Sequence, residues 1–257
     1  LPNAGEPQTA PRDYGTVTVQ AVSVPEATTE RRRVFCMPVS VAPDLPGEPT
    51  LWSATVDALA VGTDVVRDGA QLRLLSQPDP GAARLVVVSA GNVQHYVANH
   101  LDESDTSIID DPGQAWNALT VGAYTDLVAS PSHPDYWGWS PVAGAGELSP
   151  HSRTSLGYGS KWPLKPDICM EGGNVLTDGA SMFEPAHPIT SLRTTGHHND
   201  RALAHANATS AASAQAARIA ALAMSRYPGY WPETIRGLLT HAAEWTTPMR
   251  AAIDQEG

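Results

Sequence analysis

Two polar residues that are far apart in the sequence each lie beside an apolar segment that could position them for acyl-transfer chemistry. Ser210 precedes the Ala-rich stretch 211–225, whose apolar residues have helical spacing. A hydroxyl at that point lies near the positive end of the helix dipole, and the Ser210 backbone N–H can stabilise a developing negative charge. Asn92 follows the Val-rich run 84–89, from which its side-chain amide could face a substrate. A nucleophile and oxyanion donors are two of the components that acyl transfer requires.

Both residues also have a structural interpretation. Serine is a common N-cap, so Ser210 considered alone would more often cap a helix than attack a substrate. Asparagine after a strand is more often a turn residue than an oxyanion donor, and the same holds for Asn92. The chemical interpretation therefore depends on the rest of the sequence.

The surrounding pattern predicts an α/β fold in which helices flank a parallel sheet. The Val-rich run suits a parallel strand that is buried on both faces. An apolar, β-branched run, a segment of helical spacing and this strand follow one another, which is typical of a right-handed βαβ unit. The predicted strands are 34–41, 84–89 and 118–124, and the predicted helices are 51–60, 211–225 and 232–243.

Two other regions have weaker patterns. The first 30 residues are rich in Pro, Thr and Glu, and only 16–22 alternates as a strand would. Residues 126–200 are dominated by Gly, Pro, Ser and His, so we expect loops there.

Four short motifs, taken in order, resemble the subtilase family of serine peptidases over about residues 34–246. They are Ser89-Ala90-Gly91-Asn92, Ser152-Arg153-Thr154-Ser155, Lys165-Pro166-Asp167-Ile168 and Ala208-Thr209-Ser210-Ala211-Ala212. Each is weak alone, whereas four in order at compatible spacing are a strong signal. The resemblance implies a three-layer αβα subtilisin-like fold and endopeptidase activity on polypeptides. It further implies that residues 1–257 are one partial catalytic domain whose N-terminal part is missing.

The resemblance also implies roles for particular residues. Ser210 matches the nucleophile and Asn92 matches the side chain of the oxyanion hole. Val39 to Val41 resemble the strand that pairs with the substrate backbone, and Ser89 to Gly91 resemble the wall of the pocket for the residue before the scissile bond. The substrate-binding residues implied in this way are Val39, Ser40, Val41, Ser89, Ala90, Gly91 and Thr209.

The sequence departs from the family pattern in two respects. Ala208 and Ala214 stand where the family has Gly and Pro, and Ala208 would be strained if its backbone requires positive φ. The family's Asp and His motifs precede the oxyanion Asn, but here no such motif occurs and all nine histidines follow Asn92. His205 is a poor substitute base, because five residues are too short a connection to aim it at the Ser210 hydroxyl.

We therefore expect the chain to be inactive alone, with the acid and base supplied from upstream. The alternative is a degenerate subtilase module that binds peptides without cleaving them.

Composition excludes several other classes. The net charge is −11 and the pI is about 5.1, which argues against nucleic-acid binding. We expect the arginines at 31–33 to be a solvated strand edge.

Cys36 and Cys169 are expected to be reduced, buried thiols. We expect no metal, since His197 and His198 beside Asp200 do not have a convincing ligand arrangement, and no cofactor. No run is long and apolar enough for a membrane span, and we expect a cytoplasmic location.

Overall fold

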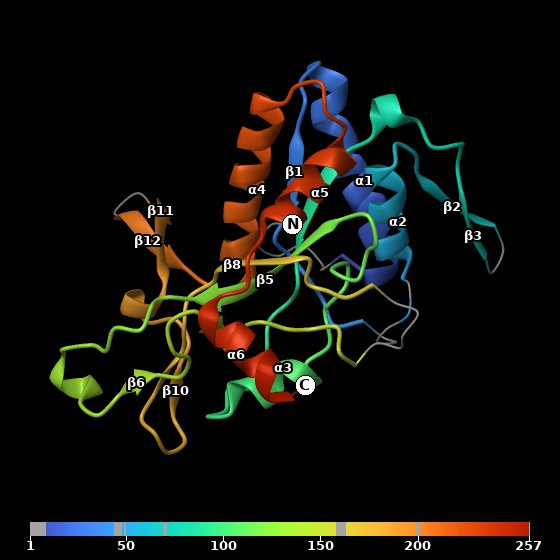
Figure 1. The fold of residues 1–257 in the computed structure, drawn as a ribbon. Helices are drawn as coiled ribbons and strands as arrows, with labels where there is room; N and C mark the ends of the chain where they lie inside the picture. Colours follow the sequence, from blue (N-terminus) through green and yellow to red (C-terminus); the bar gives the residue numbers. More distant parts are fainter. Residues whose placement is uncertain are drawn as a thin grey trace.

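A mainly parallel β-sheet lies between two layers of helices (Figure 1). The computed structural model describes residues 9–43, 48, 50–68, 71–157, 163–198 and 201–256. Strands β1 (Val34–Met37), β4 (Leu85–Ser89) and β5 (Leu119–Thr125) are parallel neighbours in that order. β8 (Ile168–Glu171) also pairs parallel with β5, and β7 (Glu147–Leu148) pairs antiparallel with it.

The other elements surround this sheet. The helices are α1 (Tyr14–Thr28), α2 (Leu51–Ala60), α3 (His100–Thr106), α4 (Ala208–Arg226), α5 (Pro232–Ala242) and α6 (Thr247–Glu256). The short 3-10 helices are η1 (Pro11–Asp13), η2 (Pro80–Ala82), η3 (Pro134–Tyr136) and η4 (Pro188–Thr190). The outlying strands are β2 (Val65–Asp68), β3 (Gln71–Leu74), β6 (Ser140–Pro141), β9 (Leu176–Thr177), β10 (Phe183–Glu184), β11 (Leu192–His198) and β12 (Arg201–Ala206).

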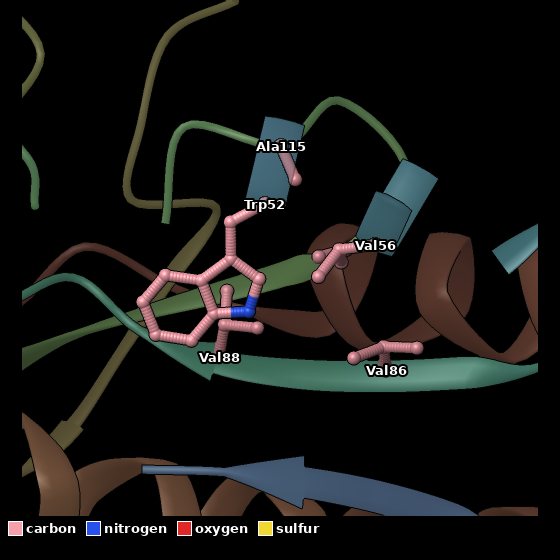
Figure 2. Close-up of a cluster of buried hydrophobic side chains, with 6 residues drawn as sticks. Trp52, Val56, Val86, Val88 and Ala115 are labelled. Carbon is pink, nitrogen blue, oxygen red and sulfur yellow. The ribbon is translucent and has the colours of Figure 1, made fainter. Parts of the chain in front are cut away.

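Strand β4 is buried on both faces and builds two separate cores. Val86 and Val88 pack against Trp52 and Val56 of α2, as Figure 2 shows. Val87 lies on the opposite face, in a cluster with side chains of β5 and α4. Because strand side chains alternate between faces, a continuous Val run supplies both cores at once. The prediction of a doubly buried strand at 84–89 is confirmed.

The predicted helices and the second central strand are also confirmed. α2 has the predicted bounds, and it begins at a capping box in which the Thr50 side chain accepts from the Ser53 N–H at 3.0 Å. α4 is longer than predicted at its N-terminal end and α5 ends one residue earlier, while β5 is displaced by one residue. Local periodicity and helix caps were sufficient to predict these elements. Each helix buries one regular stripe of side chains, and the strand is buried on both faces.

The prediction of a strand at 16–22 is wrong, because this segment lies inside helix α1. The residues of α1 that are buried are Gly15, Thr18 and Val22, which recur at helical spacing. The Trp52 indole N–H donates to the Thr18 hydroxyl at 2.8 Å, which ties α1 to α2. At Gly15 an added Cβ would lie 2.6 Å from Thr55 Oγ1, so glycine permits the close approach of the two helices. Contacts with α2, rather than local β propensity, decide this segment.

The prediction of a buried strand over the whole of 34–41 is also wrong. β1 ends at Met37, and the described part of the sheet pairs it on one side only, with β4. Cys36 is consequently exposed, which contradicts the expected buried thiol. Cys169 on β8 is half-buried, and burial of its thiol raises its pKa to about 12. Neither cysteine is in a disulfide.

The arginines at 31–33 lie at the far end of the sheet from Ser210. Arg31 and Arg32 are exposed, as expected of a solvated strand edge, whereas Arg33 is half-buried, and the side chains of Arg32 and Arg33 also bond to backbone carbonyls. Arg33 donates to Pro25 O and Thr29 O, both at 2.7 Å, and so satisfies carbonyls at the C-terminal end of α1. Arg32 donates to Tyr230 O at 2.5 Å and to Pro228 O. A cavity of about 570 Å³ lies beside them, and none of the predicted site residues lines it.

In the described part of the stretch 126–200, loops connect short strands and the 3-10 helices η3 and η4 before the β11–β12 hairpin, as expected. Within the described ranges, no helix combines the length and apolar character needed to cross a membrane. The described residues also contain no group of three or more His, Cys, Asp or Glu side chains arranged to hold a metal ion. Asp200 lies outside the described residues.

Candidate functional site

Ser210 lies in the first turn of α4. The N-cap is Asn207 rather than Ser210, so the capping interpretation of this serine is wrong. The Ser210 hydroxyl donates to the Pro38 carbonyl at 2.8 Å, just beyond the end of β1. The backbone N–H of a first-turn residue has no intrahelical acceptor, so the Ser210 N–H remains available at the positive end of the helix.

The backbone before Ser210 is strained. Ala208 has φ of 63°, and no other non-glycine residue in the described chain has positive φ. Its N–H donates to Gly172 O at 2.5 Å. The strain anticipated from the alanine at this position is therefore present, and it costs about 1 kcal/mol relative to a residue without Cβ.

Asn92 lies directly beside the residue that precedes Ser210. Its Oδ1 accepts from the Thr209 backbone N–H at 3.1 Å and lies 2.8 Å from the Thr209 hydroxyl. That hydroxyl is also 3.0 Å from Gly91 O, so its single proton is shared. Because the Thr209 N–H can only donate, the atom of the Asn92 amide that faces it must be the acceptor Oδ1 and not Nδ2. Among the described residues, Nδ2 of Asn92 has no acceptor and can face a substrate oxygen.

Three segments thus meet at one edge of the sheet. The ends of β1 and β4 supply Pro38 and Asn92, and the start of α4 supplies Ser210, 118 positions after Asn92. The carboxyl ends of parallel strands lie on the same edge of a sheet, which brings the first two together. The rigid α4 places the third.

The residues predicted to bind substrate backbone are not equivalent. Val39 is 42% exposed and Ser40 is half-buried, so this stretch offers an accessible edge. Val41 is different, because its N–H and C=O both pair with Asp111 at 2.9 Å. Pairing with an added strand is therefore left to Val39 and Ser40, with the Pro38 carbonyl.

The predicted wall of the substrate pocket is buried. Ser89 and Ala90 are 1% and 0% exposed, and Gly91 is buried as well. The Ala90 N–H donates to Val121 O at 3.0 Å, and Ala90 O accepts from the Asp110 N–H at 3.0 Å. In the described structure these residues form packed support beneath the site rather than an open surface.

Sequence reasoning missed the groups that surround Asn92. The side chain of Arg153 donates to Asn92 O at 2.7 Å, and the buried Asp110 lies beneath the same peptide. His151 is 1% exposed, and its Nδ1 lies 2.9 Å from the Tyr96 hydroxyl. Burial lowers the pKa of His151 to about 4, so it is neutral near pH 7. Arg153 lies in a motif that had been noted, whereas Asp110 had only the neighbouring Asp-Pro-Gly turn as a signal.

The Lys-Pro-Asp motif supports the sheet instead of the reaction. Lys165 is 3% exposed and donates through Nζ to Asp167 Oδ2 at 2.7 Å and to Ala118 O at 3.0 Å. The same carboxylate oxygen accepts from the Thr120 N–H at 2.7 Å. Burial lowers the pKa of Lys165, and the nearby Asp167 charge opposes that shift. The motif therefore fixes the beginning of β5.

A general base is not found beside Ser210 in the described part of the chain. The hydrogen bond of its hydroxyl is to a carbonyl, and no histidine whose side chain is described contacts it. His205 is exposed on β12, where its backbone pairs with Arg193.

Comparison with known proteins decides the family. The model of the subtilase family, Peptidase_S8, matches residues 5–256. The chain belongs to the subtilase family. The uncharacterized protein y4bN of Sinorhizobium fredii (strain NBRC 101917 / NGR234) is 26% identical over an alignment of 220 residues, which covers 77% of this chain and 44% of that protein.

A solved protease structure supports the same fold for this subtilase. The prenylagaramide maturation protease PagA matches with a TM-score of 0.54 and 14% identity, over 95% of this chain and 61% of that one. A psychrophilic protease, S41, matches with a TM-score of 0.45 and 16% identity, over 92% of this chain and 57% of that one. This chain therefore spans less than two thirds of the length of these proteins. The predicted α/β subtilisin-like fold is confirmed.

Proposed function

We propose that this subtilase chain carries the nucleophile and oxyanion hole of a serine endopeptidase. The observation that carries the proposal is the contact between Thr209 and Asn92, which holds Asn92 Oδ1 beside the nucleophile segment and leaves Nδ2 without an acceptor among the described residues. In the proposed reaction the Ser210 hydroxyl oxygen attacks the substrate carbonyl. Asn92 Nδ2 and the Ser210 N–H then donate to the oxygen that becomes negative.

The proposed reaction requires a base that takes the Ser210 proton. A serine hydroxyl is a weak nucleophile near pH 7 without one. We assign the base and its orienting carboxylate to a histidine and an aspartate N-terminal to Leu1, following the subtilase order Asp, His, Ser. The chain alone is then inactive or nearly so.

The proposed substrate is an extended polypeptide. An accessible stretch at Val39 and Ser40 can pair with substrate backbone, as peptides add to exposed strand edges. The Pro38 carbonyl becomes available to such a strand when the Ser210 hydroxyl leaves it to engage a base. The family and the similarity to the prenylagaramide maturation protease PagA support a polypeptide substrate.

One observation favours a second candidate function. The Ser210 hydroxyl donates its hydrogen bond to the Pro38 carbonyl rather than to a base. A module in which this arrangement persists would bind peptides without cleaving them. The sequence before Leu1 distinguishes the two candidates, because an Asp motif followed by a Gly-flanked His motif is needed for cleavage only.

Substitution in the protein that contains this chain and its upstream segment tests the enzyme proposal. Ser210→Ala should abolish peptide cleavage, and Asn92→Ala should reduce kcat by roughly 10²- to 10³-fold, the usual effect of removing one oxyanion donor. Ser225→Ala is the matched control, because this exposed serine lies at the other end of α4. Cleavage at the original rate by the Ser210→Ala protein would refute the proposal.

A further inference from the structure

A buried carboxylate lies directly beneath the oxyanion segment. Asp110 is 4% exposed, its carboxylate accepts from the Ser40 hydroxyl at 3.2 Å, and the Asn92 backbone N–H lies beside it. Gly91, with φ of 90°, allows this approach, since a Cβ there would lie 2.3 Å from Asp110 Oδ2. The glycine before Asn92 is thus required by both its backbone conformation and its contact with Asp110.

Arg153 holds the other side of the same peptide. Its side chain is 13% exposed, and Nε donates to Asn92 O at 2.7 Å. Nη1 donates to Ile108 O at 2.7 Å and lies 3.2 Å from Asp110 Oδ1. Asp110 Oδ1 has no hydrogen-bond donor among the described residues, so the guanidinium balances its charge by proximity. A buried charge requires such a partner.

Asn92 is consequently fixed on three sides. Arg153 donates to its C=O, Thr209 donates to its Oδ1, and the Asp110 carboxylate lies beside its N–H. Nδ2 has no acceptor among the described residues. An oxyanion donor is effective when it is held in place before the reaction, so that it need not reorient as the charge develops.

We propose that Asp110 and Arg153 are positioning residues that fix the Asn92 peptide and thereby aim Nδ2 at the oxyanion. The inference rests on the proposed function, because it assigns a task to the groups behind Asn92. Through the Ser40 hydroxyl, the same ion pair connects the oxyanion segment to the stretch proposed to bind substrate.

A different role for Asp110 is that of a receptor for a basic substrate side chain, since it lies between Ser40 and Gly91. The geometry disfavours it. Arg153 already neutralises the carboxylate at 3.2 Å, and a second cation at the same place would be repelled. The positioning role therefore predicts the same effect of substitution on all substrates.

Kinetics in the protein that contains the complete catalytic machinery test the inference. Asp110→Asn retains the shape and an acceptor oxygen but loses the charge, and Arg153→Met loses both the charge and the bond to Asn92 O. Each should lower kcat by about tenfold or more, with KM within about twofold, because displacement of a catalytic group by an ångström can cost up to about 10²-fold. Arg153→Lys should recover part of the loss.

The chain offers a matched control for general destabilisation. Arg84 and Glu26 form another partly buried pair, with Nε 2.8 Å from Oε1, far from Ser210. Arg84→Met should lower stability but leave kcat unchanged. A loss of kcat in this control as large as that of Arg153→Met would overturn the inference, as would unchanged kcat in both site variants. So would a loss confined to substrates with Lys or Arg before the scissile bond.

Amide hydrogen exchange provides a readout that needs no activity. In the 257-residue chain, Arg153→Met should accelerate exchange of the Asn92 N–H by roughly tenfold or more, while the N–H of Val87 in β4 should be unaffected. Unchanged exchange at Asn92 would overturn the positioning role. If instead Ser210→Ala left cleavage intact, the proposed function would fail, and this measurement would still decide whether the ion pair fixes Asn92.

Discussion

The two strands that lead to the site differ in how they are held. β4 is buried on both faces and paired on both sides, and it delivers Asn92. β1 is paired on one side only in the described sheet, is half-exposed, and delivers Pro38 and the accessible stretch after it. A donor to a developing charge must be fixed, whereas a surface that pairs with a substrate strand must be accessible. Under the proposed function, these demands fall on different strands.

Thiol labelling should reveal most strongly the difference between the exposed strand β1 and the interior of the sheet, because one cysteine lies on β1 and the other lies on β8, which pairs with β5. Cys36 on β1 is exposed, and the Cys169 thiol on β8 is packed 3.0 Å from where a Cβ on Gly122 would be. We expect the Cys36 thiol to be alkylated roughly 10²- to 10⁴-fold faster, because Cys169 requires local opening and burial raises its pKa to about 12. Mass spectrometry after timed alkylation would measure both rates. Equal rates would mean that β8 is as open as β1.

Matched valine substitutions should differ in the free energy of unfolding. Val87→Ala removes two methyl groups from a residue with 0% exposure and should cost about 2–3 kcal/mol. Val39→Ala, at a residue 42% exposed, should change stability by less than about 0.5 kcal/mol. Denaturant unfolding of both variants gives the comparison. A cost at Val39 equal to that at Val87 would contradict the exposed edge.

The free energy of unfolding should depend on pH through Asp111. The backbone of this residue pairs with Val41, which follows β1. Burial raises the pKa of Asp111 to about 6, and hydrogen bonds from Thr50 oppose the shift. In the unfolded chain this carboxyl ionises near pH 4. The stability that the protonated Asp111 side chain contributes to the fold is therefore fully present below pH 4 and is lost as the pH rises through 6. Asp111→Asn should therefore stabilise the fold above pH 6 by on the order of 2 kcal/mol, with no gain at pH 4.

Unfolding curves at several pH values would measure this effect. Asp135→Asn is the control for the Asp-to-Asn change itself, because that side chain is 81% exposed. A gain for Asp111→Asn that is the same at pH 4 and pH 8 would assign it to packing rather than to ionisation.

The smallest expected change in the free energy of unfolding comes from a substitution at the start of α4. Ala208→Gly should raise the free energy of unfolding by about 0.5–1 kcal/mol, because φ of 63° carries no penalty for glycine. Ala221→Gly, at an exposed interior position of the same helix, should instead lower it by about 1 kcal/mol. Thermal unfolding would resolve the opposite signs. A loss of stability in Ala208→Gly would show that the positive φ is not strained.

Some elements were predictable because their sequence encodes the burial pattern directly. The Val run of β4 and the apolar stripes of α2, α4 and α5 each have a period that permits one structure. The motifs around Asn92 and Ser210 could likewise be recognised from residue type and order, and the structure places Asn92 beside Thr209. The roles assigned to these two residues remain predictions.

Only the tertiary structure decided the rest. Helix α1 alternates like a strand in sequence, and its contacts with α2 make it a helix. The exposure of Cys36 depends on which strands lie beside β1, which its own apolar sequence does not specify. Asp110 and Arg153 are 43 positions apart, and neither carries a local pattern that signals the other. Apolar periodicity records which face of an element is buried, whereas a pairing between two single charged residues exists only once the chain has folded.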